Sequence, residues 1–188
     1  MWGPFLLPTF GLLLNRGGLP FKTADLNLTI RPGTPDFLVE LITKRRGIQQ
    51  GRLALSQDNR IEGLRMLGDA LSSVSLTDSS LAADYFMGSE ILAEAWREQG
   101  DSTNAAEVLG AALEKESFLL LEQSVLTGPL WLKLQAQLSQ LYREMGQDED
   151  ARKIENELRR LLALADSDHP ILRELNRTKE LALREPAN

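Results

Sequence analysis

The chain has 188 residues and a formal net charge of −6 at pH 7, from 21 basic and 27 acidic residues. This acidic balance argues against nucleic acid or an anionic membrane as the main partner, because both attract basic proteins. The chain has no cysteine, which excludes disulfides, thiol catalysis and thiolate metal sites, and its single histidine excludes a site that needs two imidazoles from one chain. The length suits one domain with a core of its own.

Residues 1–33 are expected to form an extended arm or a short β-hairpin in front of the helices. Residues 2–14 are largely apolar, but prolines and a glycine interrupt them, and the run is shorter than the ~20 residues of a membrane-spanning helix. Leu26, Leu28 and Ile30 alternate with polar residues, as in a half-buried strand. Because a lone hairpin is only marginally stable, the arm needs cover from the first helices, from a second copy of the chain in a homo-oligomer, or from an upstream domain.

Thr34-Pro35 marks the expected start of the first helix, with Thr34 as its cap and Pro35 in its first turn. This helix leads into the basic run Lys44-Arg45-Arg46. Three adjacent bases suit a phosphate or an acidic partner, but a solvated helix face is the more common explanation of such a run.

The clearest element is the stretch 81–113, which predicts two amphipathic helices joined at Gly100-Asp101. Leu92 and Trp96 lie one turn apart on a stripe that faces a neighbouring helix, and Trp96 is the expected core anchor. Gly100 can adopt the left-handed conformation that ends a helix, and Asp101 can cap the next one. The stretch therefore predicts an antiparallel pair of helices.

The same pattern recurs on both sides of this pair. Downstream, the offsets among Leu92, Trp96, Gly100 and Ala105 are repeated by Leu138, Tyr142, Gly146 and Ala151. A weaker upstream copy is aligned at Asp58, where neither the turn glycine nor the aromatic residue is present. Four consecutive apolar residues, 118–121, follow the central pair. We expect them to be buried between two hairpins, and the alternative is that part of the run is an exposed surface for a partner.

The end of the chain predicts a capping helix opened by Pro170. The residues ahead of it, Asp166, Asp168 and His169, resemble a metal or acid/base cluster in type alone, since their spacing does not continue into a calcium loop. Helix caps explain them better. The charged outer face of this helix suits the end of a repeat array.

These motifs together resemble the tetratricopeptide repeat. The resemblance rests on Leu92-x-x-x-Trp96-x-x-x-Gly100-Asp101 with the small residues that follow it, and on its downstream copy, and it covers about residues 45–165. It implies an all-α fold, a right-handed α-solenoid of stacked antiparallel helix hairpins. The turns at positions 58, 100 and 146 are farther apart than the ~34 residues of the standard repeat. Longer second helices, inserted connections or a related repeat of longer period would account for the difference.

The expected organisation is an arm at 1–33 followed by a helical repeat domain at 34–185. The hairpins are expected at about 35–73, 80–121 and 129–165, with the capping helix at 170–184.

The resemblance also implies a concave groove lined by the first helix of each hairpin. The groove positions that the repeat register assigns are Arg45, Ile48, Arg52, Leu55, Met87, Glu90, Glu94, Arg97, Lys133, Ala136, Gln140 and Arg143. Some members of the family clamp a partner's C-terminal carboxylate with lysines, asparagines and an arginine at such positions. Two glutamates and the lack of asparagine argue against that clamp here. The expectation is a mixed-charge groove for a peptide or a helix, and the alternative is that these side chains are merely solvated.

We expect a non-catalytic scaffold for protein–protein interaction, without cofactor, and no catalytic, cofactor-binding or metal-binding residue is assigned. The alternative is a C-terminal regulatory or oligomerisation module of a larger enzyme or sensor, which the arm's need for cover favours. The lack of cysteine fits a cytoplasmic location, with the soluble portion of a membrane-attached protein as the alternative.

Overall fold

The computed structural model describes residues 30–121, 126–166 and 168–184 of the chain. Regular structure within these residues is entirely helical, which confirms the expected all-α class for this part of the chain. The expected β-hairpin of the arm falls on residues 1–29, outside the described residues. None of the helices in the described ranges is both long and apolar enough to cross a membrane.

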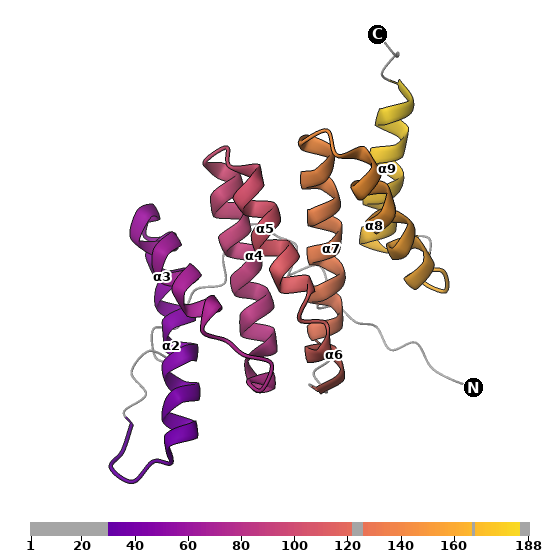
Figure 1. Ribbon diagram of the computed structural model, residues 1–188. Coiled ribbons are helices and arrows are strands. Elements are labelled where there is room, and N and C mark those ends of the chain that lie inside the picture. Colours follow the sequence, from indigo (N-terminus) through magenta and orange to yellow (C-terminus); the bar gives the residue numbers. More distant parts are fainter. Residues whose placement is uncertain (1–29, 122–125, 167, 185–188) are drawn as a thin grey trace, which may run out of the picture.

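The described helices follow one another as antiparallel pairs, which stand side by side in Figure 1. The pairs are α2 (Asp36–Ser56) with α3 (Arg60–Ser72), α4 (Ala82–Glu98) with α5 (Ser102–Leu113), and α7 (Thr127–Glu144) with α8 (Asp148–Leu161). The remaining elements are the 3₁₀ helix η2 (Ser79–Leu81), the short α6 (Ser117–Leu121) and the terminal α9 (Pro170–Arg184). Neighbouring pairs pack through α3 against α4 and through α5 against α7.

The turns inside the pairs share one backbone conformation. Asp58, Gly100 and Gly146 have φ values of 61°, 80° and 73°. At each turn the amide of the next residue donates to the carbonyl five residues back, at 2.7–3.0 Å, as in a Schellman helix end. The cap expected at Asp101 is confirmed, since its side chain accepts from the Asn104 amide at 3.0 Å. The upstream turn closes in the same way, with Asp58 in the place of glycine.

The start of α2 differs from its prediction. Pro35 is the N-cap, and no side chain caps the helix. The Thr34 hydroxyl donates to the Arg31 carbonyl oxygen at 2.8 Å. Thr34 therefore stabilises the turn ahead of the helix and leaves the first-turn amides of α2 unbonded by its side chain.

One core extends from α2 to α7, and its centre is aromatic. Tyr85, Phe86 and Phe118 meet edge to face with ring centroids 5.8–6.1 Å apart. Phe118 is fully buried, as expected of the apolar run. The predicted anchor Trp96 is only partly buried, and Phe86 fills the centre instead. Since α4 is covered by helices on several sides, its buried surface is wider than one amphipathic stripe.

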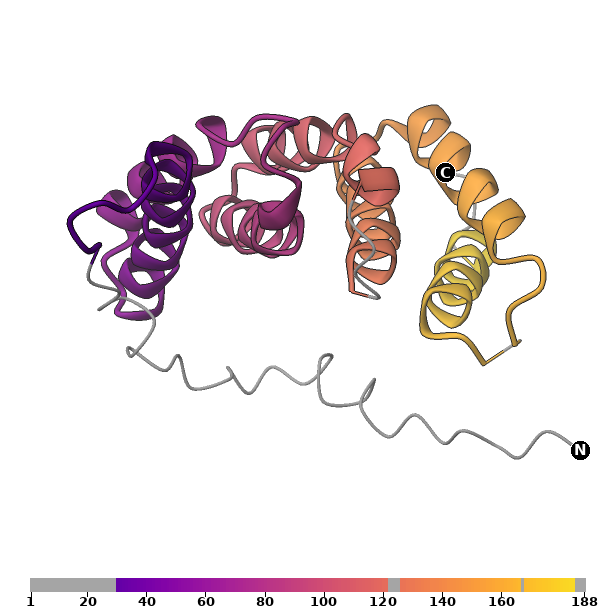
Figure 2. The ribbon, with the colours of Figure 1, turned by 90° about the horizontal axis from the view of Figure 1, so that it is seen from below.

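The pairs form an arched row in Figure 2, with α4, α7 and α9 on one side and α5 and α8 on the other. The first helices of successive pairs touch, because α4 contacts both α2 and α7, and α7 contacts α9. The side chains on α2, α4, α7 and α9 can therefore meet along the inner side of the arch.

Candidate functional site

A small hollow lies between α4 and α7. Its lining consists of Glu90, Ala93, Glu94, Arg97, Leu109, Gln137, Gln140 and Leu141. The sequence assigned Glu90, Glu94, Arg97 and Gln140 among these to the groove. The apolar floor comes from Ala93, Leu109 and Leu141, which are nearly inaccessible to solvent. The structure thus brings predicted groove residues of two successive hairpins around one apolar floor.

The polar groups around the hollow bridge α4 and α7. Lys133 Nζ lies 2.5 Å from Glu90 Oε1, and Gln137 Nε2 donates to the same oxygen at 3.3 Å. Arg97 binds Glu144 with two guanidinium nitrogens, one of them Nε at 3.2 Å from Oε2. Each bridge joins a first helix to the next, so the charges that were expected to face a partner also tie the hairpins together.

A similar bridge joins α2 and α4. Arg45 Nε lies 2.8 Å from Asp84 Oδ2, and Gln49 Nε2 donates to Oδ1 of the same carboxylate at 3.2 Å. Burial lowers the pKa of the Arg52 guanidinium, and the nearby carboxylates of Asp84 and Glu90 oppose that shift. Arg52, on α2, is therefore close both to Asp84 of the α2–α4 bridge and to Glu90 of the hollow.

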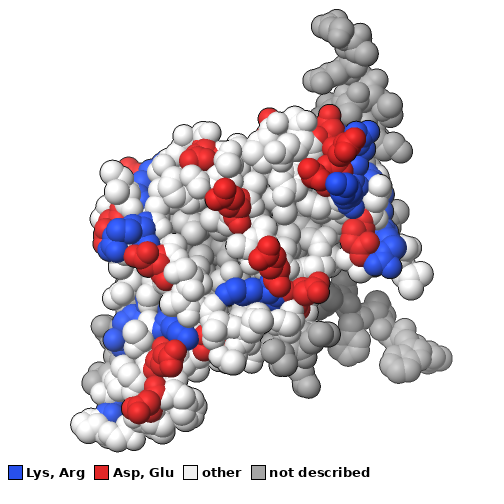
Figure 3. Space-filling view, in the orientation of Figure 1, with Lys and Arg blue, Asp and Glu red and all other residues white. Residues whose placement is uncertain are grey.

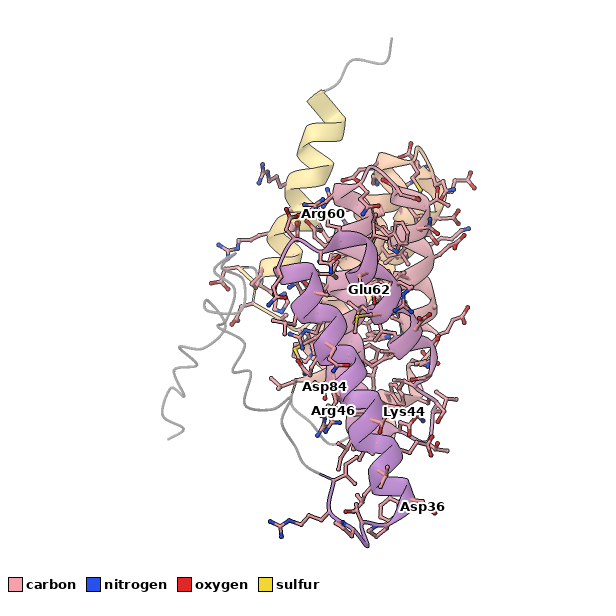
Figure 4. All side chains as sticks on the ribbon, turned by 90° about the vertical axis from the view of Figure 1, so that its left-hand side faces the viewer. Asp36, Lys44, Arg46, Arg60, Glu62 and Asp84 are labelled. Carbon is pink, nitrogen blue, oxygen red and sulfur yellow. The ribbon has the colours of Figure 1, made fainter. Side chains whose placement is uncertain are left out.

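The basic run of α2 does not form one patch. Figure 4 shows Lys44 and Arg46 leaving α2 on opposite sides, with Asp84 on the Arg46 side. Lys44 is held by Glu40 at 2.7 Å and by Asp78 at 2.8 Å. A single phosphate or acidic partner group thus has no common surface of these three bases to bind.

Gln140, which lines the hollow, and the remaining predicted residues also make contacts outside it. Gln140 Nε2 donates to Glu174 Oε1 of α9 at 2.6 Å. Arg143 binds Glu155 of α8 with Nε at 3.0 Å and Asp148 with Nη1 at 2.9 Å, so its head joins the two helices of its own pair. Met87 is half-buried on α4.

The apolar positions of the same register other than Met87 are less open than a groove requires. Ile48 is buried in the large core and Leu55 packs against it, whereas Ala136 is buried in a smaller cluster with Leu158 and Leu175. The part of the register that remains accessible is therefore its polar part.

The bridges also contain residues that the sequence did not single out. Gln137 lies one turn after Lys133, and Glu144 one turn after Gln140, so helical spacing on α7 could have found both. Asp84 lies one turn before Met87 on α4 and could have been found in the same way, whereas Glu174 lies on α9, outside the assigned register.

The arrangement can form hydrogen bonds and ion pairs with a ligand. Within the described ranges no three His, Asp or Glu side chains come close enough to hold a metal ion. Figure 3, which views the side opposite the hollow, shows basic and acidic side chains next to one another rather than a field of one sign.

Comparison of the chain with known proteins found no match. No protein-family model, curated protein or solved structure matches the chain. The function is therefore inferred from the geometry of the described residues.

Proposed function

We propose that the protein is a non-catalytic interaction scaffold that binds a peptide or helix of a partner protein along the inner side of its arch. The proposal treats the chain as a right-handed α-solenoid of tetratricopeptide-like hairpins. Its support is the repeated turn geometry at Asp58, Gly100 and Gly146 and the contact of each first helix with the next.

The observation that carries the proposal is the hollow between α4 and α7. Four residues that the repeat register assigns to the groove line it, namely Glu90, Glu94, Arg97 and Gln140. The hollow is much smaller than a small-molecule pocket, so a partner segment would lie across its polar rim and the surfaces of α4 and α7 beside it. The side chains of Glu90, Arg97 and Gln140 are already held by bonds to neighbouring helices, so a ligand need not order them on binding.

A protein segment suits this surface better than a polyanion. Nucleic acid binding depends on several lysines and arginines that are free to neutralise phosphates. Three cations that the structure describes on the inner side, Arg45, Arg97 and Lys133, are instead bound to carboxylates. A segment with both polar and apolar side chains can use the rim and the floor together.

Selection from a random peptide display library, with the full chain as bait, tests the proposal. Glu94→Trp would place a bulky side chain at the rim while removing only a loose contact, and Ala111→Trp, on the exposed surface of α5, is the matched control. We expect enriched peptides to bind Glu94→Trp at least about tenfold more weakly, or ~1.4 kcal/mol, and to bind Ala111→Trp as well as they bind the unchanged chain. Absence of enriched peptides, or equal binding to the two variants, would contradict the proposal.

A further inference from the structure

We infer that the apolar run of residues 2–14 binds within the same molecule to a second apolar stripe on α2, on the inner side of the arch. The inference is independent of the hollow and of any partner protein, because it concerns α2 and a segment of the same chain. It rests on the stripe, on the composition of the run and on the length of chain that joins them.

Two apolar stripes run along α2. The first belongs to the large core or packs against it, and it consists of Leu41, Ile48 and Leu55. The second follows another line of the same helix, and it consists of Leu38, Val39, Ile42 and Leu53. The side chains of the second stripe are partly exposed, and none of them belongs to either apolar cluster of the described residues. One apolar side of α2 thus faces the core, and the other does not.

The second stripe lies on the inner side of the arch. Arg46 lies one turn after Ile42 on the same line, and Figure 4 shows it leaving α2 on the side of Asp84. Asp84 is the residue of α4 that binds Arg45 and Gln49 in the bridge between α2 and α4. The stripe is therefore beside this bridge, at the end of the arch that the first hairpin forms.

The charged groups beside the stripe suit an uncharged occupant. Arg45 and Asp84 are paired at 2.8 Å, and Arg45 also donates to the Ser80 carbonyl oxygen at 3.0 Å. Arg46 is half-buried, and an arginine can lay its methylene stem along an apolar surface while its guanidinium reaches water. An apolar segment leaves the pair of Arg45 and Asp84 intact, whereas a charged segment would compete with it.

Residues 2–14 have the composition that such a stripe accepts. The run contains no charged residue. Its large apolar side chains are Trp2, Phe5, Leu6, Leu7, Phe10, Leu12, Leu13 and Leu14. Apolar side chains are less stable in water than against other apolar groups, so contact with the stripe stabilises both surfaces.

The length of the chain ahead of α2 allows the contact within one molecule. The described residues begin at residue 30, and the turn at residues 31–34 leads directly into α2. The residues from 14 to 30 span up to ~50 Å when extended, whereas the 21 residues of α2 form a helix ~32 Å long. The run can therefore reach any part of the stripe. Because a tethered segment has a high effective concentration, this contact is favoured over the same contact with a second copy of the chain.

Paramagnetic relaxation in NMR spectra of the full chain tests the contact. The chain has no cysteine, so Asn15→Cys carries a single nitroxide label directly after the run. We expect the label to broaden the amide signals of α2 around the second stripe. A tethered label broadens some nearby signals without any contact, so the effect is judged against variants that keep the same tether.

The first variant changes the run. Phe5→Asp together with Phe10→Asp introduces charges that an apolar stripe does not accept, so most of the broadening on α2 should be lost. Both changes lie outside the described helices. Thr23→Asp is the matched control, because it adds a charge to the same arm outside the run, and it should leave the broadening unchanged. Equal broadening with and without the charges in the run would overturn the inference.

The second variant changes the stripe. Ile42→Asp should reduce the broadening on α2, whereas Ile61→Asp, at a position 85% exposed on α3, should not. Unchanged signals of the core residues Phe86 and Phe118 show that the fold is intact in both. If Ile42→Asp and Ile61→Asp gave equal broadening with the fold intact, the run would not bind the stripe. If Ile42→Asp disturbed the core signals, the variant of the run alone would decide.

A mixture distinguishes a contact within one molecule from a contact between two. An isotope-labelled chain without nitroxide is mixed with a chain that carries the nitroxide and no isotope. We expect no broadening of the α2 signals in this mixture. Broadening there would show that a second copy supplies the run, and it would overturn the assignment to the same molecule.

Discussion

At the scale of single residues, Gly51 lies where the backbones of α2 and α3 approach each other closely. A Cβ atom at Gly51 would stand 2.6 Å from the backbone nitrogen and 2.7 Å from the Cα atom of Leu67. Since backbone atoms cannot yield as a flexible side chain can, we expect Gly51→Ala to reduce the free energy of unfolding by about 1–3 kcal/mol in urea denaturation.

Gly68 on α3 is the matched control for this change. A Cβ there meets nothing within 4 Å. Because alanine favours a helix over glycine, Gly68→Ala should raise the free energy of unfolding by about 0.5–1 kcal/mol. If Gly51→Ala were also stabilising, the close approach of the two helices would be contradicted.

At the scale of elements, Asp78 fastens the connection between α3 and α4 to α2. Its carboxylate accepts from Lys44 Nζ at 2.8 Å, from the Ser75 amide at 2.8 Å and from the Ser75 hydroxyl at 2.9 Å. Burial alone would raise the pKa of Asp78, but the hydrogen bonds from Lys44 and Ser75 outweigh it and lower the pKa below the usual value. The connection is thus held most firmly when Asp78 is ionised.

The lowered pKa of Asp78 determines in which direction the free energy of unfolding changes with pH. A carboxyl group with a lowered pKa in the folded state stabilises the fold above its unfolded pKa and loses that contribution as the pH falls through the folded pKa. We therefore expect the free energy of unfolding to decline below about pH 4, and Asp78→Asn to make that decline shallower. Urea denaturation between pH 7 and pH 2.5 measures both slopes, and identical slopes would contradict the role of Asp78.

The bridge between Glu90 and Lys133 tests whether the inner side also holds successive hairpins together. Glu90→Lys would place a third cation near Arg52 and Lys133, so each single charge reversal should destabilise the fold. The double exchange Glu90→Lys with Lys133→Glu should recover part of the loss, with a coupling energy of about 1 kcal/mol. A double-mutant cycle by urea denaturation measures this energy, and a value near zero would contradict the bridge.

At the scale of the whole molecule, the core is divided unequally. The large core runs from α2 to α7, whereas the described side chains of α9 join a separate small cluster of Ala136, Leu158 and Leu175. Helices with few buried neighbours open at lower free energy than central ones. We expect the amides of α9 to exchange through an opening at least about 2 kcal/mol below that of α4 in native-state hydrogen exchange. Equal opening free energies would show that the described helices unfold as one unit.

The sequence by itself determined the all-α class, the turns at Gly100 and Gly146, the cap at Asp101 and the burial of Phe118. These features depend on helical periodicity and on the conformational range of a few adjacent residues, so they can be deduced from local spacing. Asp58 shows how far this holds, because its turn was located without the glycine that such a turn favours.

Only the tertiary structure decided that Phe86 rather than Trp96 fills the core, that Thr34 does not cap α2, and how the inner side is paired. Arg45 meets Asp84 across 39 residues, and Arg97 meets Glu144 across 47. The repeat register places such side chains on one side of their own helices, but it does not say which side chain of the next helix stands opposite. That choice depends on how successive hairpins pack, which local periodicity does not contain.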